Sequence, residues 1–172
     1  MKIVCVMVST ADGIIAKHSG HNVDWSSPED KAMFTAETIK HQAVILGIST
    51  YQAIGRMLPK RYNLVLTQNP KDFKNQAVPD KLEFFSGTPQ AVIEFLENKG
   101  YQSAALIGGG KTNAEFFKAG LVDELMLTIE PKLFGQGLNL TGNTDFELSL
   151  KLREFKKLNA NTVWLHYQVI KD

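Results

Sequence analysis

Residues 43–68, AVILGISTYQAIGRMLPKRYNLVLTQ, constrain the fold more than any other stretch of this chain. The apolar run at 43–46 ends at a glycine, and a second apolar run covers 63–67. Short apolar runs bounded by turn residues are typical of buried strands. The segment between them predicts a short helix over 50–54. Two strands joined by a helix lie parallel in one sheet, so this block predicts an α/β fold.

The rest of the chain continues the alternation of strands and helices. Apolar runs predict strands over 3–8, 64–67, 82–85, 104–107 and 124–129, with a short piece at 13–16 after which a polar loop covers 17–24. Helical patterns cover 28–40, 89–98 and 112–119. Period-two alternation over 146–158 and 162–170 predicts a C-terminal antiparallel hairpin. We expect a three-layer sandwich with a mostly parallel central sheet, helices on both faces, and ligands at the carboxyl ends of the strands.

Composition limits the classes of function. At 172 residues, 44% hydrophobic and 22% charged, the chain is expected to form one domain over 1–172. A formal charge of +1 gives no reason to expect a nucleic-acid or membrane partner. Cys5 is the only cysteine, and the histidines lack ligand spacing, so we expect no metal site. No apolar run approaches the ~20 residues of a membrane span, which makes the cytoplasm the default location.

Asp30, within WSSPEDKAMF, allows two interpretations. Ser27 and Asp30 are spaced as in a capping box, and acids favour the first turn of a helix. Alternatively, Phe34 lies one turn further along the same helix face, and a carboxyl beside an aromatic in an apolar cleft has a raised pKa and can hold a proton near neutral pH. The two interpretations are compatible.

Two further motifs indicate ligand binding. The run IGGGKT, residues 107–112, follows a predicted strand and precedes a helix, which permits close backbone approach to a ligand. A tight strand-to-helix turn would need the same glycines, and the run matches neither common phosphate-binding pattern. Arg61, in LPKRYN, is either a solvated turn residue or an oriented cation for a carboxylate.

Together these segments resemble the dihydrofolate reductase superfamily over nearly the whole chain. The 43–68 block is similar to GRxTxESIGRPLPxRxNIVLT, residues 23–35 to LPWxLPEDLxxFK, and residues 107–113 to IGGGxxY. The resemblance implies a reductase that transfers hydride from NADPH to its substrate. It also implies a cis peptide between the first two glycines of the IGGG run.

The resemblance assigns the substrate side of the site. Asp30 matches the acid that promotes protonation of the pterin N5, Thr128 matches its hydrogen-bond partner, and Trp25 matches the tryptophan that closes the mobile loop. Phe34 would pack on the pterin, and Arg61 would bind the carboxylate of the glutamate tail. The implied substrate-binding residues are Val6, Asp30, Phe34, Ile54, Leu58, Arg61, Ile107 and Thr128.

The resemblance also assigns the NADPH site. The implied cofactor-binding residues are Val8, Ile15, Ala16, Gly47, Ser49, Thr50, Thr67, Gln68, Ile107, Gly109, Gly110, Lys111 and Thr112. Two positions depart from the family pattern. Ile48 replaces the arginine that favours the 2′-phosphate, and Asn113 replaces the tyrosine beside the nicotinamide.

Three functions remain open at this level. Asp30, Phe34 and Arg61 favour dihydrofolate reductase, acting as a monomer or homodimer on dihydrofolate. The segments STADGIIA and GLVDELMLTIEPKLFGQG resemble the riboflavin-pathway pyrimidine reductases, which share the fold and NADPH. Ile48 and Asn113 favour a third alternative, a pterin- or nicotinamide-binding homologue without turnover.

Overall fold

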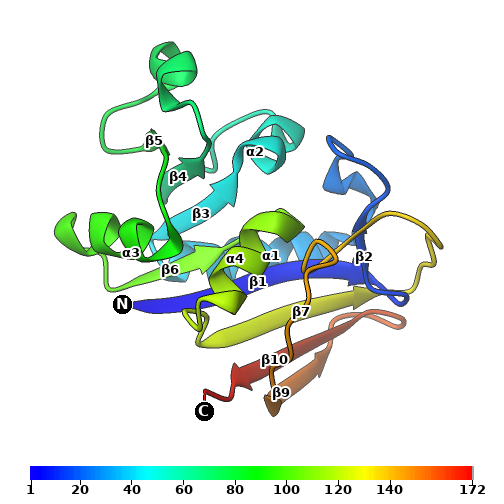
Figure 1. Ribbon diagram of the computed structural model, residues 1–172. Helices are drawn as coiled ribbons and strands as arrows, with labels where there is room; N and C mark the ends of the chain where they lie inside the picture. The colour runs from blue at the N-terminus through cyan, green and yellow to red at the C-terminus, as the bar shows by residue number, and fades with distance from the viewer. Residues whose placement is uncertain (172) are drawn as a thin grey trace.

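The computed structural model describes residues 1–171 and is built on one large sheet (Figure 1). Its strands are β1 (Lys2–Thr10), β3 (Ala43–Gly47), β4 (Tyr62–Leu66), β5 (Leu82–Phe85), β6 (Ser103–Leu106), β7 (Glu124–Glu130), β9 (Leu150–Lys157) and β10 (Val163–Val169). They lie in the order β5-β4-β3-β6-β1-β7-β10-β9. The pairs from β5 to β7 are parallel, whereas β10 is antiparallel to both β7 and β9. The predicted fold class is therefore confirmed.

Helices cover both faces of this sheet (Figure 1). They are α1 (Pro28–Lys40), α2 (Ile48–Ile54), α3 (Pro89–Asn98) and α4 (Gly110–Lys118). Ser27 and Thr88 cap α1 and α3 through their hydroxyls, and each is followed by a proline at the first helical position. The sequence thus fixes the start of both helices by the same local chemistry.

Alternation along the strands divides the core into two apolar clusters. Ile3, Cys5 and Ile45 face α3 and α4, where Leu96 and Phe116 complete the first cluster. The intervening residues of the same strands face α1 and α2 and form the second cluster, which contains Val4, Val6, Val44, Leu46, Ile107, Met126 and Trp164. Because β3 and β6 are covered on both faces, their sequences read as continuous apolar runs.

Some predicted bounds were wrong. The strand expected over 146–158 begins only at Leu150, and residues 140–149 instead cross the face of the sheet (Figure 1). Phe146 stacks on Phe117 of α4, with ring centroids 5.9 Å apart, so its apolar side chain serves the core without strand pairing. Helices α2 and α4 each begin two residues earlier than expected, because Gly47 and Gly109 take the N-cap positions.

Three short elements were not predicted. They are η1 (Val23–Trp25), η2 (Pro70–Gln76) and β8 (Leu138–Asn139), which pairs with β2 (Ile14–Ala16). Their sequences are polar or lack periodicity, so their structure depends on contacts with residues distant in the sequence.

Candidate active site

A cleft of about 820 Å³ lies at the carboxyl ends of β3, β4, β5 and β6. Gly47, Thr67, Phe85 and Gly109 each follow or end one of these strands and line the cleft. The short strand β8 closes another side through Leu138 and Asn139. Open α/β sheets bind ligands at this edge, where several loops converge, and the position agrees with the expectation from sequence.

The floor of the cleft is made by two interlocked turns. The Gly47 N–H donates to the Gly108 carbonyl at 2.7 Å. A β-carbon on Gly47 would lie 2.7 Å from the Thr112 hydroxyl, and one on Gly109 would lie 3.2 Å from the Thr50 hydroxyl. Each turn therefore places a threonine against the other turn's glycine. The Gly108–Gly109 peptide is cis, as the sequence resemblance implied.

The cleft is nearly neutral in charge. Among the described residues that line it, Lys111 is the only lysine or arginine and Glu115 is the only acid. Hydroxyl and amide groups of Ser49, Thr67 and Gln68 supply further donors and acceptors. Ile48, the position of the missing arginine, is also a lining residue.

Most of the residues assigned to NADPH lie around this one cleft. Nine of them line it: Gly47, Ser49, Thr50, Thr67, Gln68, Gly109, Gly110, Lys111 and Thr112. The other four, Val8, Ile15, Ala16 and Ile107, do not. Ile15 is buried, and Ala16 belongs to β2, whose partner strand β8 lines the cleft.

Asn113, which stands at the position of the family's tyrosine, is a packing residue of α4. Its side chain is fully buried, and its amide donates to the Leu140 carbonyl at 3.0 Å. Asn113 therefore attaches α4 to the segment that follows β8. Among the described residues, it is not part of the cleft lining.

Asp30 lies in the first turn of α1 and is not among the residues that line this cleft. Its side chain is only 5% exposed, and its N–H donates to the Ser27 hydroxyl at 3.2 Å. Burial raises the pKa of the Asp30 carboxyl, while the hydroxyls of Thr128 and Ser26 act in the opposite direction. Capping geometry and a protonatable buried acid therefore coexist at this turn.

Glu130, which the sequence analysis did not select, is a second buried acid near Asp30. It is 3% exposed and ends β7 two residues after Thr128, on the same face of the strand. Its negative charge contributes to the raised pKa of Asp30. The sequence did contain a signal for Glu130. Alternation along β7 places it on the face that α1 covers, together with Met126 and Thr128.

The apolar residues assigned to the substrate fall into one cluster. Val6 and Ile107 are buried in the core beneath α1 and α2, and Phe34, Ile54 and Leu58 pack against that core while remaining half-buried. This arrangement brings α1, α2 and the following turn together on the face that carries Asp30. It provides apolar surface of the kind that a flat heterocycle contacts.

Arg61 is not a solvated turn residue. It is 8% exposed, its Nε donates to the Pro59 carbonyl at 2.9 Å, and its Nη1 donates to the Thr38 hydroxyl of α1. Burial lowers the pKa of its guanidinium. Asn63 holds the same turn by bonding both backbone groups of Leu58. Arg61 therefore joins the 58–61 turn to α1.

Trp25 sits where the 17–25 segment meets the loop after β7. Its ring packs edge-on against Phe134, with centroids 5.1 Å apart, and Lys17 lies over the same Phe134 ring. The Asp12 carboxylate, also missed by sequence reasoning, accepts the Gly135 N–H at 2.7 Å and fixes that loop. A shallow hollow of about 420 Å³ beside Trp25 reaches Ser27 and Glu130.

Residues 1–171 lack two further kinds of feature. No helix there is long and apolar enough to cross a membrane. No group of three or more histidine, cysteine, aspartate or glutamate side chains within that range is arranged to hold a metal ion.

Comparison with known proteins places these features in a family. The model of the RibD C-terminal domain matches residues 1–164. A dihydrofolate reductase of Haemophilus influenzae is 33% identical over 138 residues, which span 78% of this chain and 76% of that protein.

Solved structures agree on the fold. A pyrimidine reductase-like protein of Corynebacterium diphtheriae superposes with a TM-score of 0.82 at 15% identity, over 99% of this chain and 92% of that one. A dihydrofolate reductase of Enterococcus faecalis, complexed with NADP(H), superposes with a TM-score of 0.76 at 21% identity, over 99% and 97%. The chain therefore belongs to the RibD C-terminal domain family within the dihydrofolate reductase-like superfamily of reductases.

Proposed function

We propose that this protein is a dihydrofolate reductase, which uses NADPH to reduce 7,8-dihydrofolate to tetrahydrofolate. The observation that carries the proposal is Asp30, a buried carboxyl whose pKa is raised by burial and which faces the hydroxyl of Thr128. A group with these properties can hold a proton near neutral pH and deliver it to a ring nitrogen.

The cleft fits a dinucleotide. Its volume, about 820 Å³, lies within the usual range for cofactor sites. Gly47 and Gly109 allow the two turns of its floor to pack closely, each against a threonine hydroxyl of the other turn. Lys111, Thr50 and Thr112 would hold the phosphates. When bound, NADPH supplies the hydride that is added to C6 of dihydrofolate.

The chain's own residues supply orientation and a proton. Asp30 would bind the amino-substituted edge of the pterin and raise the effective pKa of N5, with Thr128 orienting its carboxyl. Phe34, Ile54 and Leu58 would exclude water from the ring and the aminobenzoyl part. Trp25 would close the site from the 17–25 segment.

The test is spectrophotometric NADPH oxidation with dihydrofolate as substrate. Asp30→Asn is expected to lose hydride transfer near neutral pH by roughly 100-fold or more, the contribution of a general acid. Part of the rate should return at low pH, where the substrate is already protonated. Asp24→Asn, an equal charge change at an exposed position of η1, serves as the control. Near-normal turnover of Asp30→Asn at neutral pH would exclude the proposed role.

A second function is favoured by the family model. The match to the RibD C-terminal domain over residues 1–164 supports reduction of a ribosylaminopyrimidine phosphate. The same assay with that substrate separates the two proposals, because the Asp30 role predicts turnover of dihydrofolate. Binding of NADPH without turnover of either substrate would indicate a homologue that has lost catalysis.

A further inference from the structure

Glu130 is held by two hydrogen bonds at the end of β7. Its Oε1 accepts the Ser27 N–H at 2.7 Å, and its Oε2 accepts the Thr162 hydroxyl at 2.9 Å. Ser27 precedes α1, and Thr162 precedes β10. One buried carboxylate therefore connects three segments that are distant in the sequence.

The bond to Ser27 reaches Asp30 in one further step. Ser27 is the N-cap of α1, and its hydroxyl accepts the Asp30 N–H at 3.2 Å. Glu130 thus fixes Ser27, which in turn caps the first turn of α1. Thr128, from the same strand and face, approaches the Asp30 carboxyl directly. The end of β7 therefore supplies both a partner for the carboxyl and an anchor for its backbone.

Burial is the largest cause of the raised pKa of Asp30, and the charge of Glu130 acts in the same direction. Glu130 acts from β7 and raises the pKa of Asp30, whereas Lys31, from α1 itself, lowers it. Lys31 extends toward the Asp24 carbonyl, 3.3 Å from its Nζ. The strands packed against α1 contribute apolar residues, including Val4, Val6 and Ala105. Glu130 is thus the nearby anion that disfavours a second negative charge.

We propose that Glu130 is a positioning residue for Asp30, which fixes the first turn of α1 on the end of β7 and places a negative charge beside the neighbouring carboxyl. This inference rests on the proposed function, because it assigns Asp30 the role of proton holder. It adds a second buried acid that acts through the first and does not contact the substrate.

The decisive measurement is the titration of the Asp30 side-chain carboxyl by ¹³C NMR in the absence of ligands, assigned with Asp30→Asn. Glu130→Gln keeps an oxygen acceptor for the Ser27 N–H and removes the charge. It is expected to move the Asp30 midpoint to lower pH than in the wild-type protein. Thr162→Val removes a hydrogen bond but leaves the charge, and it should leave the midpoint nearly unchanged. A midpoint that does not fall in Glu130→Gln overturns the proposal.

A second variant protects the test against misfolding. Glu130→Met combined with Thr162→Val removes the charge and its hydroxyl partner at similar volume, and the same fall in the Asp30 midpoint is expected. Turnover supplies an independent readout: in Glu130→Gln the alkaline decline of dihydrofolate reduction should shift in the same direction as the midpoint. If the wild-type protein does not reduce dihydrofolate, the proposed function fails while the titration still decides the role of Glu130.

Discussion

At the scale of single residues, Asp30 is subject to two influences that favour opposite protonation states of its carboxyl. As part of the α1 N-terminus it lies near free helix N–H groups, which favour an anion. As a 5% exposed side chain near Glu130 it is driven toward its protonated form. Burial prevails, since the net direction of its pKa shift is upward. Such a residue is retained at a cost in stability, which is typical of functional sites.

This conflict predicts how stability depends on pH. Because the folded-state pKa of Asp30 is raised, the folded protein binds this proton more tightly than the unfolded chain, and that stabilisation is lost as pH rises through the folded pKa. Asp30→Asn should therefore be more stable than wild type at pH 7 and above, by about 1 kcal/mol, and equal to it in acid. Urea unfolding at several pH values measures the difference. A gap that is independent of pH would contradict the argument.

Arg61 allows substrate binding and protein stability to be tested separately. Arg61→Ala removes the group proposed to hold the substrate carboxylate, and it should raise the KM for dihydrofolate about tenfold or more, since charged hydrogen bonds contribute about 1.5–3 kcal/mol. Thr38→Val removes the internal partner of Arg61 but keeps the guanidinium, so it should lower stability while changing KM little. Steady-state kinetics and urea unfolding of both variants test this. An unchanged KM in Arg61→Ala would exclude a substrate tail at this position.

At the scale of elements, the cleft depends on backbone approach between α4 and its neighbours. A β-carbon on Gly110 would lie 2.5 Å from the Asn139 carbonyl oxygen and 2.9 Å from the Gly142 nitrogen. Both atoms are backbone and cannot rotate away. The glycines of this turn are therefore required by packing between the start of α4 and β8, as well as by any ligand.

Substitutions in this first turn of α4 should distinguish its role in packing from its role in ligand binding. Gly110→Ala is expected to destabilise the protein by about 1–3 kcal/mol through overpacking and to weaken NADPH binding as the turn moves. Lys111→Ala, at an exposed side chain one position later, should weaken NADPH binding in a salt-dependent manner without lowering Tm. Thermal unfolding and fluorescence titration with NADPH give both quantities. Equal Tm values in the two variants would contradict the packing argument.

The same elements show what the sequence can predict. Local sequence patterns predict buried strands such as 43–46 and capped helices such as α1 and α3. Their periodicity and caps do not depend on distant residues. The 146–149 segment misled the prediction, because its alternating apolar residues pack across the sheet and on Phe117. Strand β8 could not be predicted, because it forms only against β2 from the other end of the chain.

At the scale of the whole molecule, strand order creates the site. Placing β6 and β1 between β3 and β7 brings Gly109 beside Gly47, and it brings Thr128 and Glu130 to the start of α1. Motifs that resemble a known family revealed Asp30, Arg61 and the glycine turns. Glu130 and Asp12 could not be identified from the sequence, because their roles depend on hydrogen bonds to Ser27 and Gly135, which lie 103 and 123 residues away.

The open edge of the sheet is the remaining feature of the whole molecule. Every residue of β9 is exposed, and Phe155 and Leu152 are 69% and 49% exposed. An exposed edge strand with apolar side chains is a template for pairing with another copy. Its four cations, which would oppose one another across such a pair, are Lys151, Arg153, Lys156 and Lys157.

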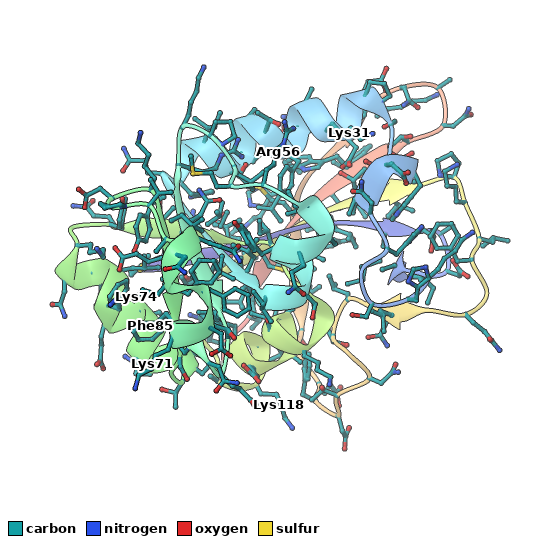
Figure 2. All side chains as sticks on the ribbon, turned by 90° about the horizontal axis from the view of Figure 1, so that it is seen from above. Lys31, Arg56, Lys71, Lys74, Phe85 and Lys118 are labelled. Carbon is teal, nitrogen blue, oxygen red and sulfur yellow. The ribbon has the colours of Figure 1, made fainter. Side chains whose placement is uncertain are left out.

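Neutralising two of these cations should therefore promote self-association. Lys151→Thr with Lys157→Thr is expected to strengthen association about tenfold, because like charges in facing strands cost about 0.2–1 kcal/mol per pair. Lys71→Thr with Lys74→Thr makes the same charge change on η2, which packs against β5 at the opposite edge of the sheet (Figure 2), and should not. Sedimentation velocity over a range of protein concentrations distinguishes them. Because both variants lose the same net charge, an equal increase in association would assign the effect to net charge alone and exclude edge pairing through β9.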